Sequence, residues 1–255
     1  MTSYREDRTV SVVVAGGTRG IGLELAESLT ERGETVVLGY GSDHDSAQAA
    51  AARLVAAGRE PLVVQSDMAT PEGSRALARV AAEVGEPVRV VVHCSVQVVP
   101  GALVDLALDD LDRTLAVNGT SLLWLTRAMV PLMQRGSSLL YLTSRGSTVV
   151  VGGYGTVGPA KAYAEALMRY LAVELAPQGI RVNALAPGTQ DTQALRAVFG
   201  DRTDEIIEAQ RAKNPSGRLV TPDDYCGVAR MLVGPESTMV TGQTVFVYGG
   251  ANLMG

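Results

Sequence analysis

A run of β-branched residues that ends in a cluster of glycines restricts the possible folds of this chain more than any other feature. Residues 10–15 read Val-Ser-Val-Val-Val-Ala, which is typical of a strand buried in a parallel sheet. Four glycines follow within residues 16–22, and residues 23–32 have the apolar spacing of a helix. A glycine turn between strand and helix lets a pyrophosphate approach the helix N-terminus, where free N–H groups favour anions. We therefore predict a dinucleotide-binding loop at 16–22.

The rest of the chain alternates short apolar runs with longer helical patterns. We predict strands at 10–15, 35–40, 61–65, 88–93, 138–142, 180–185 and 243–247. We predict helices at 20–32, 45–57, 71–84, 105–134 with a break, 155–176, 192–212 and 222–233. This alternation implies a single doubly wound Rossmann-type α/β domain over residues 1–255, with a parallel seven-stranded sheet and helices on both faces. Ligands of such sheets bind outside the carboxyl ends of the strands.

Composition argues against several classes of function. The net charge is −5 and there is no basic run, so the chain lacks the positive surface of a nucleic-acid-binding protein. No stretch approaches the roughly 18 apolar residues of a membrane span, and residues 1–9 form a polar tail without a signal-peptide pattern. Cys94 and Cys226 lack the spacing of a metal site. We expect a cytoplasmic protein that binds no metal, nucleic acid or membrane.

Tyr154, Lys161 and Ser144 form the pattern that points to chemistry. The phenol and the ammonium are seven residues apart, about two turns of a helix, so that both could project from one face. A tyrosine has an ordinary pKa of about 10, and a nearby cation favours its ionised form. A tyrosine and a lysine at this spacing, considered alone, would most simply be two unrelated surface residues. The glycine loop that precedes it favours a catalytic pair instead.

With these motifs, the chain resembles the short-chain dehydrogenase/reductase family over nearly its whole length. The resemblance implies catalytic roles for Ser144, Tyr154, Lys161 and Asn118, with Asn118 keeping its helix backbone open for a water that links Lys161 to solvent. It implies cofactor contacts from the glycine loop and from the ends of several strands. The predicted cofactor-binding residues are Gly16, Thr18, Arg19, Gly20, Ile21, Gly22, Tyr40, Ser42, Asp67, Met68, Cys94, Ser95, Lys161, Pro187, Gly188 and Thr192.

One departure indicates a subfamily. Ordinary members have Tyr-x3-Lys with a serine thirteen residues before the tyrosine, a position that Val157 occupies here. The Tyr-x6-Lys spacing of this chain is similar to that of NADPH-dependent enoyl-acyl-carrier-protein reductases. That resemblance implies reduction of the C=C bond of an α,β-unsaturated thioester, with Tyr154 as hydrogen-bond or proton donor. Two alternatives stay open: an NADPH-dependent ketoreductase for a β-keto thioester or polyketide, and an NADPH-bound cyclase, isomerase or sensor.

Further departures from the family pattern indicate an altered substrate and a role in specialised metabolism. Val96 replaces a usual glycine, and Tyr248 stands where the last strand usually has Asp. Enoyl reductases with this spacing often carry another tyrosine upstream, and residues 145–153 contain none. We interpret Tyr141, Tyr163 and Tyr170 as packing residues, because none has the register of Tyr154 with Ser144 and Lys161.

The cofactor prediction depends on charge. An NAD site usually places an acid at the end of the second strand, but residues 38–42 read Leu-Gly-Tyr-Gly-Ser. Arg19 could bind a 2′-phosphate, and Ser42 could add a hydrogen bond. Asp43 and Asp45 would repel that phosphate if they pointed inward. We predict NADPH.

Two predictions concern larger parts of the chain. Residues 189–217 alternate apolar and charged residues, and we interpret them as a mobile lid over the acyl substrate; an amphipathic surface helix is the alternative. The helices predicted at 105–134 and 155–176 are apolar on more than one face, whereas a helix packed only on its own sheet needs one apolar stripe. We therefore expect a homotetramer or homodimer.

Overall fold

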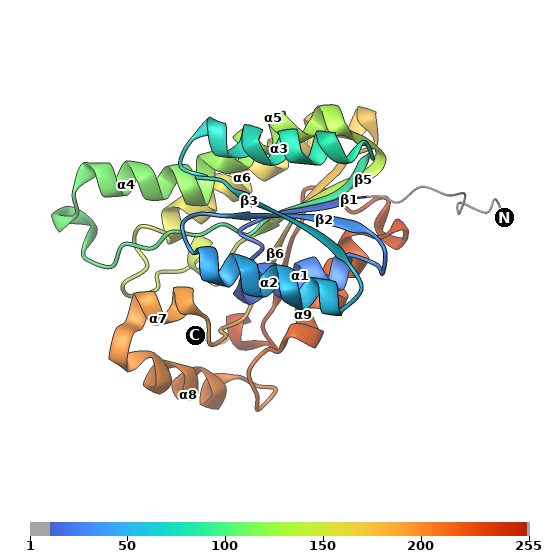
Figure 1. The fold of residues 1–255 in the computed structure, drawn as a ribbon. Coiled ribbons are helices and arrows are strands. Elements are labelled where there is room, and N and C mark those ends of the chain that lie inside the picture. The colour runs from blue at the N-terminus through green and yellow to red at the C-terminus, as the bar shows by residue number, and fades with distance from the viewer. Residues whose placement is uncertain (1–10, 254–255) are drawn as a thin grey trace.

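Valine-rich strands form the centre of the computed structural model, which describes residues 11–253 (Figure 1). The described strands are β1 (Ser11–Ala15), β2 (Thr35–Tyr40), β3 (Glu60–Gln65), β4 (Val88–His93), β5 (Met133–Leu142), β6 (Arg181–Pro187) and β7 (Thr244–Val247). All neighbours pair in parallel, in the order β3-β2-β1-β4-β5-β6-β7. The chain order reverses between β1 and β4, which is where ligands of such sheets bind.

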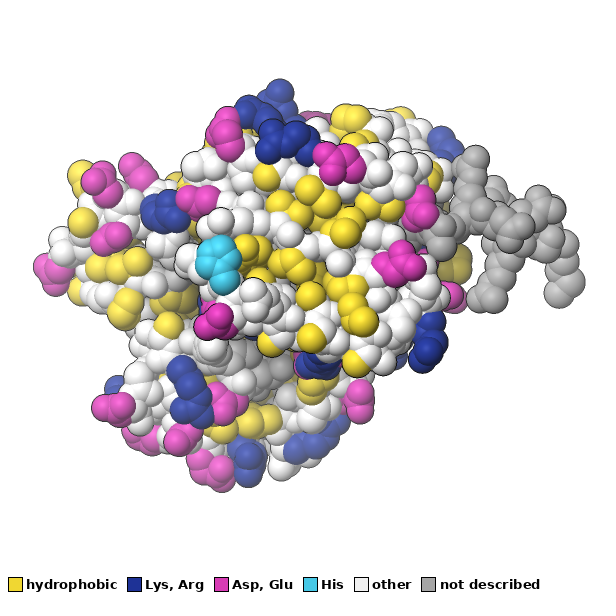
Figure 2. Space-filling view, viewed as in Figure 1, with side chains coloured by type: hydrophobic (Ala, Val, Ile, Leu, Met, Phe, Trp, Pro, Cys, Tyr) yellow, Lys and Arg dark blue, Asp and Glu magenta, His cyan; other side chains and the backbone are white. Residues whose placement is uncertain are grey.

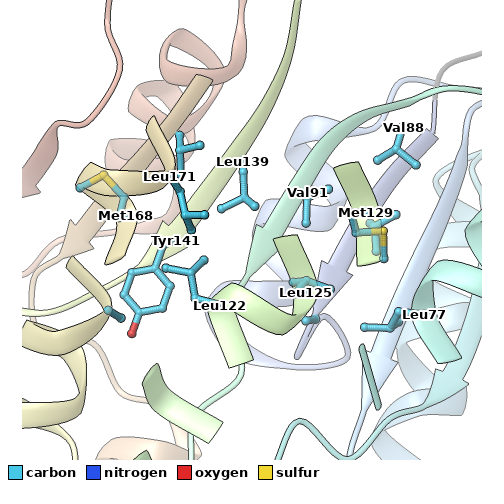
Figure 3. Packing of buried hydrophobic residues seen from close by; sticks show 14 of the residues in the cluster. Leu77, Val88, Val91, Leu122, Leu125, Met129, Leu139, Tyr141, Met168 and Leu171 are labelled. Atoms are coloured by element: carbon cyan, nitrogen blue, oxygen red, sulfur yellow. The ribbon is translucent and has the colours of Figure 1, made fainter. Parts of the chain in front are cut away.

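Helices cover both faces of this sheet. Their bounds are α1 (Gly20–Leu29), α2 (His44–Ala56), α3 (Pro71–Val84), α4 (Leu108–Leu115), α5 (Ser121–Met129), α6 (Gly158–Leu175), α7 (Gln193–Phe199), α8 (Thr203–Lys213) and α9 (Pro222–Val233). Helices α3, α5 and α6 pack on one face, and α1, α2 and α9 pack on the other (Figure 1). Figure 3 shows the first layer, where Leu122 and Leu125 of α5 meet Val91 and Leu139 of the sheet. The Rossmann-type prediction is confirmed.

The helix predicted at 105–134 with a break is confirmed apart from its ends, since α4 begins at Leu108 and α5 ends at Met129. The break is a π-helical turn at Ala116–Thr120. The side chain of Asn118 is hydrogen-bonded to the backbone of Gln97 in both directions, at 2.9 and 2.7 Å. The hydroxyl of Tyr141 donates to the Asn118 backbone carbonyl. Contacts with Gln97 and Tyr141 therefore hold the side chain and the backbone carbonyl of Asn118, which displaces this residue from the regular α-helical pattern.

Two other helix predictions need correction. The predicted helix at 155–176 begins at Gly158, because proline lacks an N–H and is accommodated only in the first turn, which here contains Pro159. The predicted helix at 192–212 is interrupted at Gly200, which has a φ of +53°. Strand β5 starts five residues before the prediction, with a register shift opposite Val88 and Val90.

Other expectations concern the N-terminal tail, membrane spans and metals. The tail at residues 1–9 lies outside the described residues, as does Val10 of the first predicted strand. Within residues 11–253, no helix combines the length and the apolar character needed to cross a membrane. The same residues contain no group of three or more His, Cys, Asp and Glu side chains that could hold a metal ion.

Candidate active site

Two cavities open at the carboxyl ends of the strands. The first, which we call the glycine cleft, has a volume of about 730 Å³ and is bounded by the loop after β1 and by the ends of β2, β3 and β4. The second, the phenol cavity, has a volume of about 250 Å³ and contains Tyr154 and Tyr248. Helices α7 and α8 form a lobe, and Figure 2 shows a hollow in the surface between this lobe and the rest of the molecule.

Close packing explains the glycines of the cleft. Gly16 has a left-handed φ of +77°, and a Cβ there would lie 2.8 Å from the backbone nitrogen of Ser95. A Cβ at Gly22 would lie 2.0 Å from the Gly16 carbonyl oxygen. Helix α1 then starts at Gly20 without a side-chain cap, so its first N–H groups remain available to an anion. The loop therefore has the shape and the donors that a pyrophosphate requires.

The predicted cofactor residues divide between the two cavities. Those that line the glycine cleft are Gly16, Thr18, Arg19, Gly20, Ile21, Gly22, Tyr40, Ser42, Asp67, Met68, Cys94, Ser95 and Thr192. Lys161, Pro187 and Gly188 line the phenol cavity instead. Arg113, which the sequence did not indicate, also lines the cleft and forms an ion pair with Asp67 at 3.1 Å. No local pattern could reveal this pair, because the two residues are 46 positions apart.

The part of the cleft near Arg19 contains an acid as well as this arginine. Asp43 lines the cleft and pairs with Arg19 at 3.0 Å. Its carboxylate also caps α2 by accepting a hydrogen bond from Ser46 N at 3.0 Å. The Ser46 hydrogen bonds and the Arg19 guanidinium lower the pKa of Asp43. Arg19 thus lines the cleft, but the neighbouring Asp43 carboxylate partly neutralises its charge.

Tyr154 and Ser144 meet across Gly146. Tyr154 lies four residues before α6, not on its face, and its carbonyl accepts from Gly158 N at 2.8 Å. A Cβ at Gly146 would lie 2.6 Å from the Tyr154 ring and 3.4 Å from Ser144 Oγ. Ser144 Oγ is buried and has no hydrogen-bond partner among the described residues. Burial raises the pKa of Tyr154, and the nearby Ser144 hydroxyl opposes this rise.

Lys161 lies in the first turn of α6 and is 4% exposed. Its Nζ donates to the Leu142 carbonyl at 2.5 Å and lies 4.6 Å from the centre of the Tyr141 ring. Burial lowers the pKa of Lys161 from 10.5 to about 8, against the opposing influence of Cys94 and Glu165. The fold therefore holds an ammonium with little solvent around it at the edge of the phenol cavity.

Tyr141 connects Asn118 to Lys161. We interpreted Tyr141 as a packing residue, and it is fully buried in the core. It also makes two polar contacts. Its hydroxyl donates a hydrogen bond to the Asn118 carbonyl, and its ring lies under the Lys161 ammonium. Asn118 was predicted to hold a water at this backbone. The tyrosine hydroxyl takes one of the two lone pairs of that carbonyl.

Cys94 lies between the two cavities as a protonated thiol. Burial raises its pKa to about 11, and the Lys161 charge only partly offsets this. The thiol therefore stays protonated and unreactive at neutral pH.

The predicted lid contributes a wall of the phenol cavity. Its lining side chains from α7 and α8 are Ala194, Leu195, Val198, Phe199, Ile206 and Gln210. Val96, which replaces a usual glycine of the family, lines both cavities. Polar side chains also line this cavity, including those of Ser144, Arg145, Tyr154 and Tyr248. The cavity therefore combines apolar side chains with hydrogen-bond donors, and it adjoins the glycine cleft.

Comparisons with known proteins agree with this arrangement. Residues 15–252 match the family model described as enoyl-(acyl carrier protein) reductase. A 1-cyclohexenylcarbonyl-CoA reductase of Streptomyces collinus is 33% identical over 97% of this chain and 89% of its own length. A rhamnolipid-biosynthesis 3-oxoacyl-[acyl-carrier-protein] reductase of Pseudomonas aeruginosa is 28% identical over 94% of this chain and 95% of its own length.

A solved structure shows the same fold with a nicotinamide cofactor. The short-chain dehydrogenase of Burkholderia cenocepacia in complex with NADP has a TM-score of 0.85 and 30% identity, and the match covers 96% of this chain and 98% of that one. The glycine cleft has the shape and the free N–H groups for such a cofactor. The chain is therefore an oxidoreductase that belongs to the short-chain dehydrogenase/reductase family and resembles its enoyl reductases.

Proposed function

We propose that this enzyme uses NADPH to reduce the C=C bond of an α,β-unsaturated acyl thioester, either carrier-bound or as a small molecule. The observation that carries the proposal is the pairing of Tyr154 with Ser144 across Gly146, in a cavity lined mostly by apolar side chains. The ordinary family position for the phenol, residue 157, holds a fully buried valine. We therefore assign the role of this phenol to Tyr154, which lines the same cavity as Ser144 and Lys161.

In this reaction, bound NADPH supplies a hydride that adds to the β-carbon of the thioester. Negative charge then moves to the thioester oxygen, and a proton added at the α-carbon completes the saturated product. Tyr154 donates a hydrogen bond to the oxygen as its charge grows, which lowers the barrier because the donor is already in place. Ser144 adds a second polar contact. The Lys161 ammonium contributes positive potential and a donor for the nicotinamide ribose.

The choice of NADPH rests on the glycine cleft. Arg19 lines the cleft near the end of β2, where the 2′-phosphate would lie, and β2 ends without an acid. The NADP complex of the Burkholderia cenocepacia relative supports the same choice. Asp43 opposes it in part, because this carboxylate pairs with Arg19.

The main alternative is reduction of a β-keto thioester. The 3-oxoacyl reductase of Pseudomonas aeruginosa favours it, and the same phenol and hydroxyl could polarise a ketone. The enoyl-reductase family model and the Streptomyces collinus relative favour the enoyl reaction.

Substitution of Tyr154 by Phe tests the proposal. We expect kcat for NADPH oxidation with crotonyl-pantetheine to fall by on the order of 10²–10⁴-fold, because the donor to the oxygen is lost. The Kd for NADPH should change little, since Tyr154 does not line the glycine cleft. Steady-state absorbance at 340 nm and cofactor fluorescence titration measure the two quantities.

The matched control is Tyr170→Phe, which removes the same hydroxyl from a residue of α6 that lines neither cavity. It should leave both quantities unchanged. Faster turnover of acetoacetyl-pantetheine than of crotonyl-pantetheine would favour the ketoreductase, and binding of NADPH without any oxidation would favour the non-redox reading. Near-native turnover of Tyr154→Phe on every accepted substrate would show that Tyr154 is a packing residue without a catalytic role.

A further inference from the structure

Tyr248 brings a second phenol to the phenol cavity from a distant part of the chain. It follows β7 and lines the cavity with Ser144 and Tyr154. Its hydroxyl oxygen accepts a hydrogen bond from the backbone N–H of Arg145 at 2.9 Å. No described residue accepts a hydrogen bond from this hydroxyl in return. Since a phenol is both acceptor and donor, the proton of Tyr248 remains free for a ligand.

The backbone that follows the Tyr248 side chain is fixed. Asn214, just after α8, donates from Nδ2 to the Tyr248 carbonyl at 3.2 Å, and Ala251 N donates to the same carbonyl at 3.1 Å. Gly249 has a left-handed φ of +59°, and a Cβ there would lie 2.6 Å from Asn214 Oδ1. The phenol is therefore held in place before any substrate arrives, which is the condition for effective stabilisation of a developing charge.

The surroundings keep Tyr248 protonated. Burial raises its pKa to about 12, with a further rise from Tyr154, while the Arg145 N–H and guanidinium oppose it. Of the described residues that line the cavity, none is Asp or Glu. Ser144 Oγ, Arg145 Nε and Gln190 Nε2 are buried there without described partners. The cavity thus offers hydrogen-bond donors and lacks an anion of its own.

We propose that Tyr248 is a further catalytic residue and the second phenol of the site, which donates a hydrogen bond to the substrate carbonyl oxygen together with Tyr154. This inference rests on the proposed function. As the hydride adds to the β-carbon, the C=C electrons shift to the thioester oxygen, and the two phenols share the resulting charge. Tyr248 keeps its proton throughout, and the α-carbon receives its proton from Tyr154 or water. A substrate in which no carbonyl is conjugated to the double bond would gain nothing from this arrangement.

Substitution of Tyr248 by Phe provides the first measurement. We expect kcat with crotonyl-pantetheine to fall by about 10–10³-fold, as for the loss of one donor to an oxyanion, with KM and the NADPH Kd within about twofold. A second readout needs no turnover: hexanoate carries a negative charge where the thioester oxygen would gain one. Its affinity for the NADP⁺ complex, measured by calorimetry, should fall by about tenfold or more.

A pair of Arg145 variants separates catalysis from positioning. Arg145→Pro removes the backbone N–H that donates a hydrogen bond to Tyr248. Arg145→Ala keeps this N–H, and both variants lose the guanidinium. Proline fits here because Ser144 is extended, with φ −153° and ψ 166°, and Arg145 begins a 3₁₀ turn. If Tyr248 acts on the substrate, the two variants should have the same kcat within about twofold. If Tyr248 only anchors the loop, the kcat of Arg145→Pro should fall below that of Arg145→Ala. This fall should be as large as the fall from the wild type to Tyr248→Phe.

The outcomes distinguish the two proposals. A Tyr248→Phe variant with native kcat and native hexanoate affinity, or an Arg145 pair that reproduces its loss, overturns the role of Tyr248. A wild type that does not reduce crotonyl-pantetheine, but binds hexanoate tenfold better than Tyr248→Phe does, overturns the enoyl reaction and leaves Tyr248 as an oxyanion donor. If the wild type neither reduces the thioester nor binds hexanoate, both proposals fall. Circular-dichroism melting of each variant identifies any that does not fold.

Discussion

Burying the ammonium of Lys161 costs free energy, and the contacts that hold it are a hydrogen bond to the Leu142 carbonyl and the Tyr141 ring. Desolvation disfavours the charged form, which is why burial lowers the pKa of Lys161 to about 8. The unfolded chain therefore binds a proton that the folded protein releases between about pH 8 and 10.5. The cost of the buried charge is largest below pH 8 and disappears as the pH rises towards 10.5.

This cost should be visible in unfolding experiments on the cofactor-free protein. Between pH 7 and pH 10, the free energy of unfolding of the wild type should rise by roughly 2–3 kcal/mol relative to that of Lys161→Met, which cannot titrate. Urea unfolding of both proteins at several pH values measures the difference. A difference that is independent of pH would mean that the folded protein leaves the pKa of Lys161 near its ordinary value.

Single residues were predictable where a short motif defines them. Ser144, Lys161 and the glycine loop follow local spacing, and the structure brings them to the two adjoining cavities. Their catalytic and binding roles stay predictions. Tyr248 and Arg113 could not be assigned in this way, because their partners lie 103 and 46 residues away. Only the folded chain shows that Tyr248 reaches the loop after Ser144.

At the scale of elements, the start of α2 controls the charge of the glycine cleft. Asp43 is both the cap of α2 and the partner of Arg19. Asp43→Asn keeps an oxygen for the cap and removes the negative charge. We expect the Kd for NADPH to fall by about 3–10-fold, because the 2′-phosphate no longer faces a carboxylate. The Kd for NADH should stay the same, and fluorescence titration measures both.

Asp45→Asn is the matched control, since it removes a charge from the same first turn of α2 without a contact to Arg19. It should change the NADPH affinity by less than Asp43→Asn does. Weaker NADH binding in Asp43→Asn would contradict the proposal, because it would indicate that this carboxylate binds a ribose hydroxyl.

Element type was easier to predict than element boundaries. The alternation of apolar runs and helical patterns gave the sheet and its helices, because burial against a sheet requires those periodicities. The boundaries depend on local exceptions. Pro159 sets the start of α6, and Asn118 opens the helix between α4 and α5 through contacts with Gln97 and Tyr141. A pattern of apolar residues contains no information about such contacts.

At the scale of the whole molecule, α6 leaves apolar side chains in solvent. Tyr170 and Val173 are 73% and 75% exposed, on the layer that also contains α3 and α5 (Figure 1). Exposed apolar surface on a helix indicates a partner. We propose that α6 pairs with α6 of a second copy, in a homodimer or homotetramer.

Substitution of Val173 by Glu should disrupt this assembly, because it would bury two like charges near the symmetry axis. We expect light scattering at micromolar concentration to give a smaller mass than for the wild type. Val55→Glu is the control, since Val55 is 61% exposed on α2, which covers the opposite face of the sheet. A wild type that is monomeric would end this proposal, and equal dissociation by both variants would move the interface away from α6.

The two cavities share part of their walls, including Ile21, Cys94, Val96 and Thr192. A compound in the phenol cavity and a cofactor in the glycine cleft would therefore contact some of the same residues, and any change that one causes in the affinity of the other is reciprocal. An inhibitor should accordingly be selected against the cofactor-loaded enzyme. Screening the empty protein would discard compounds that bind only when the cofactor is present.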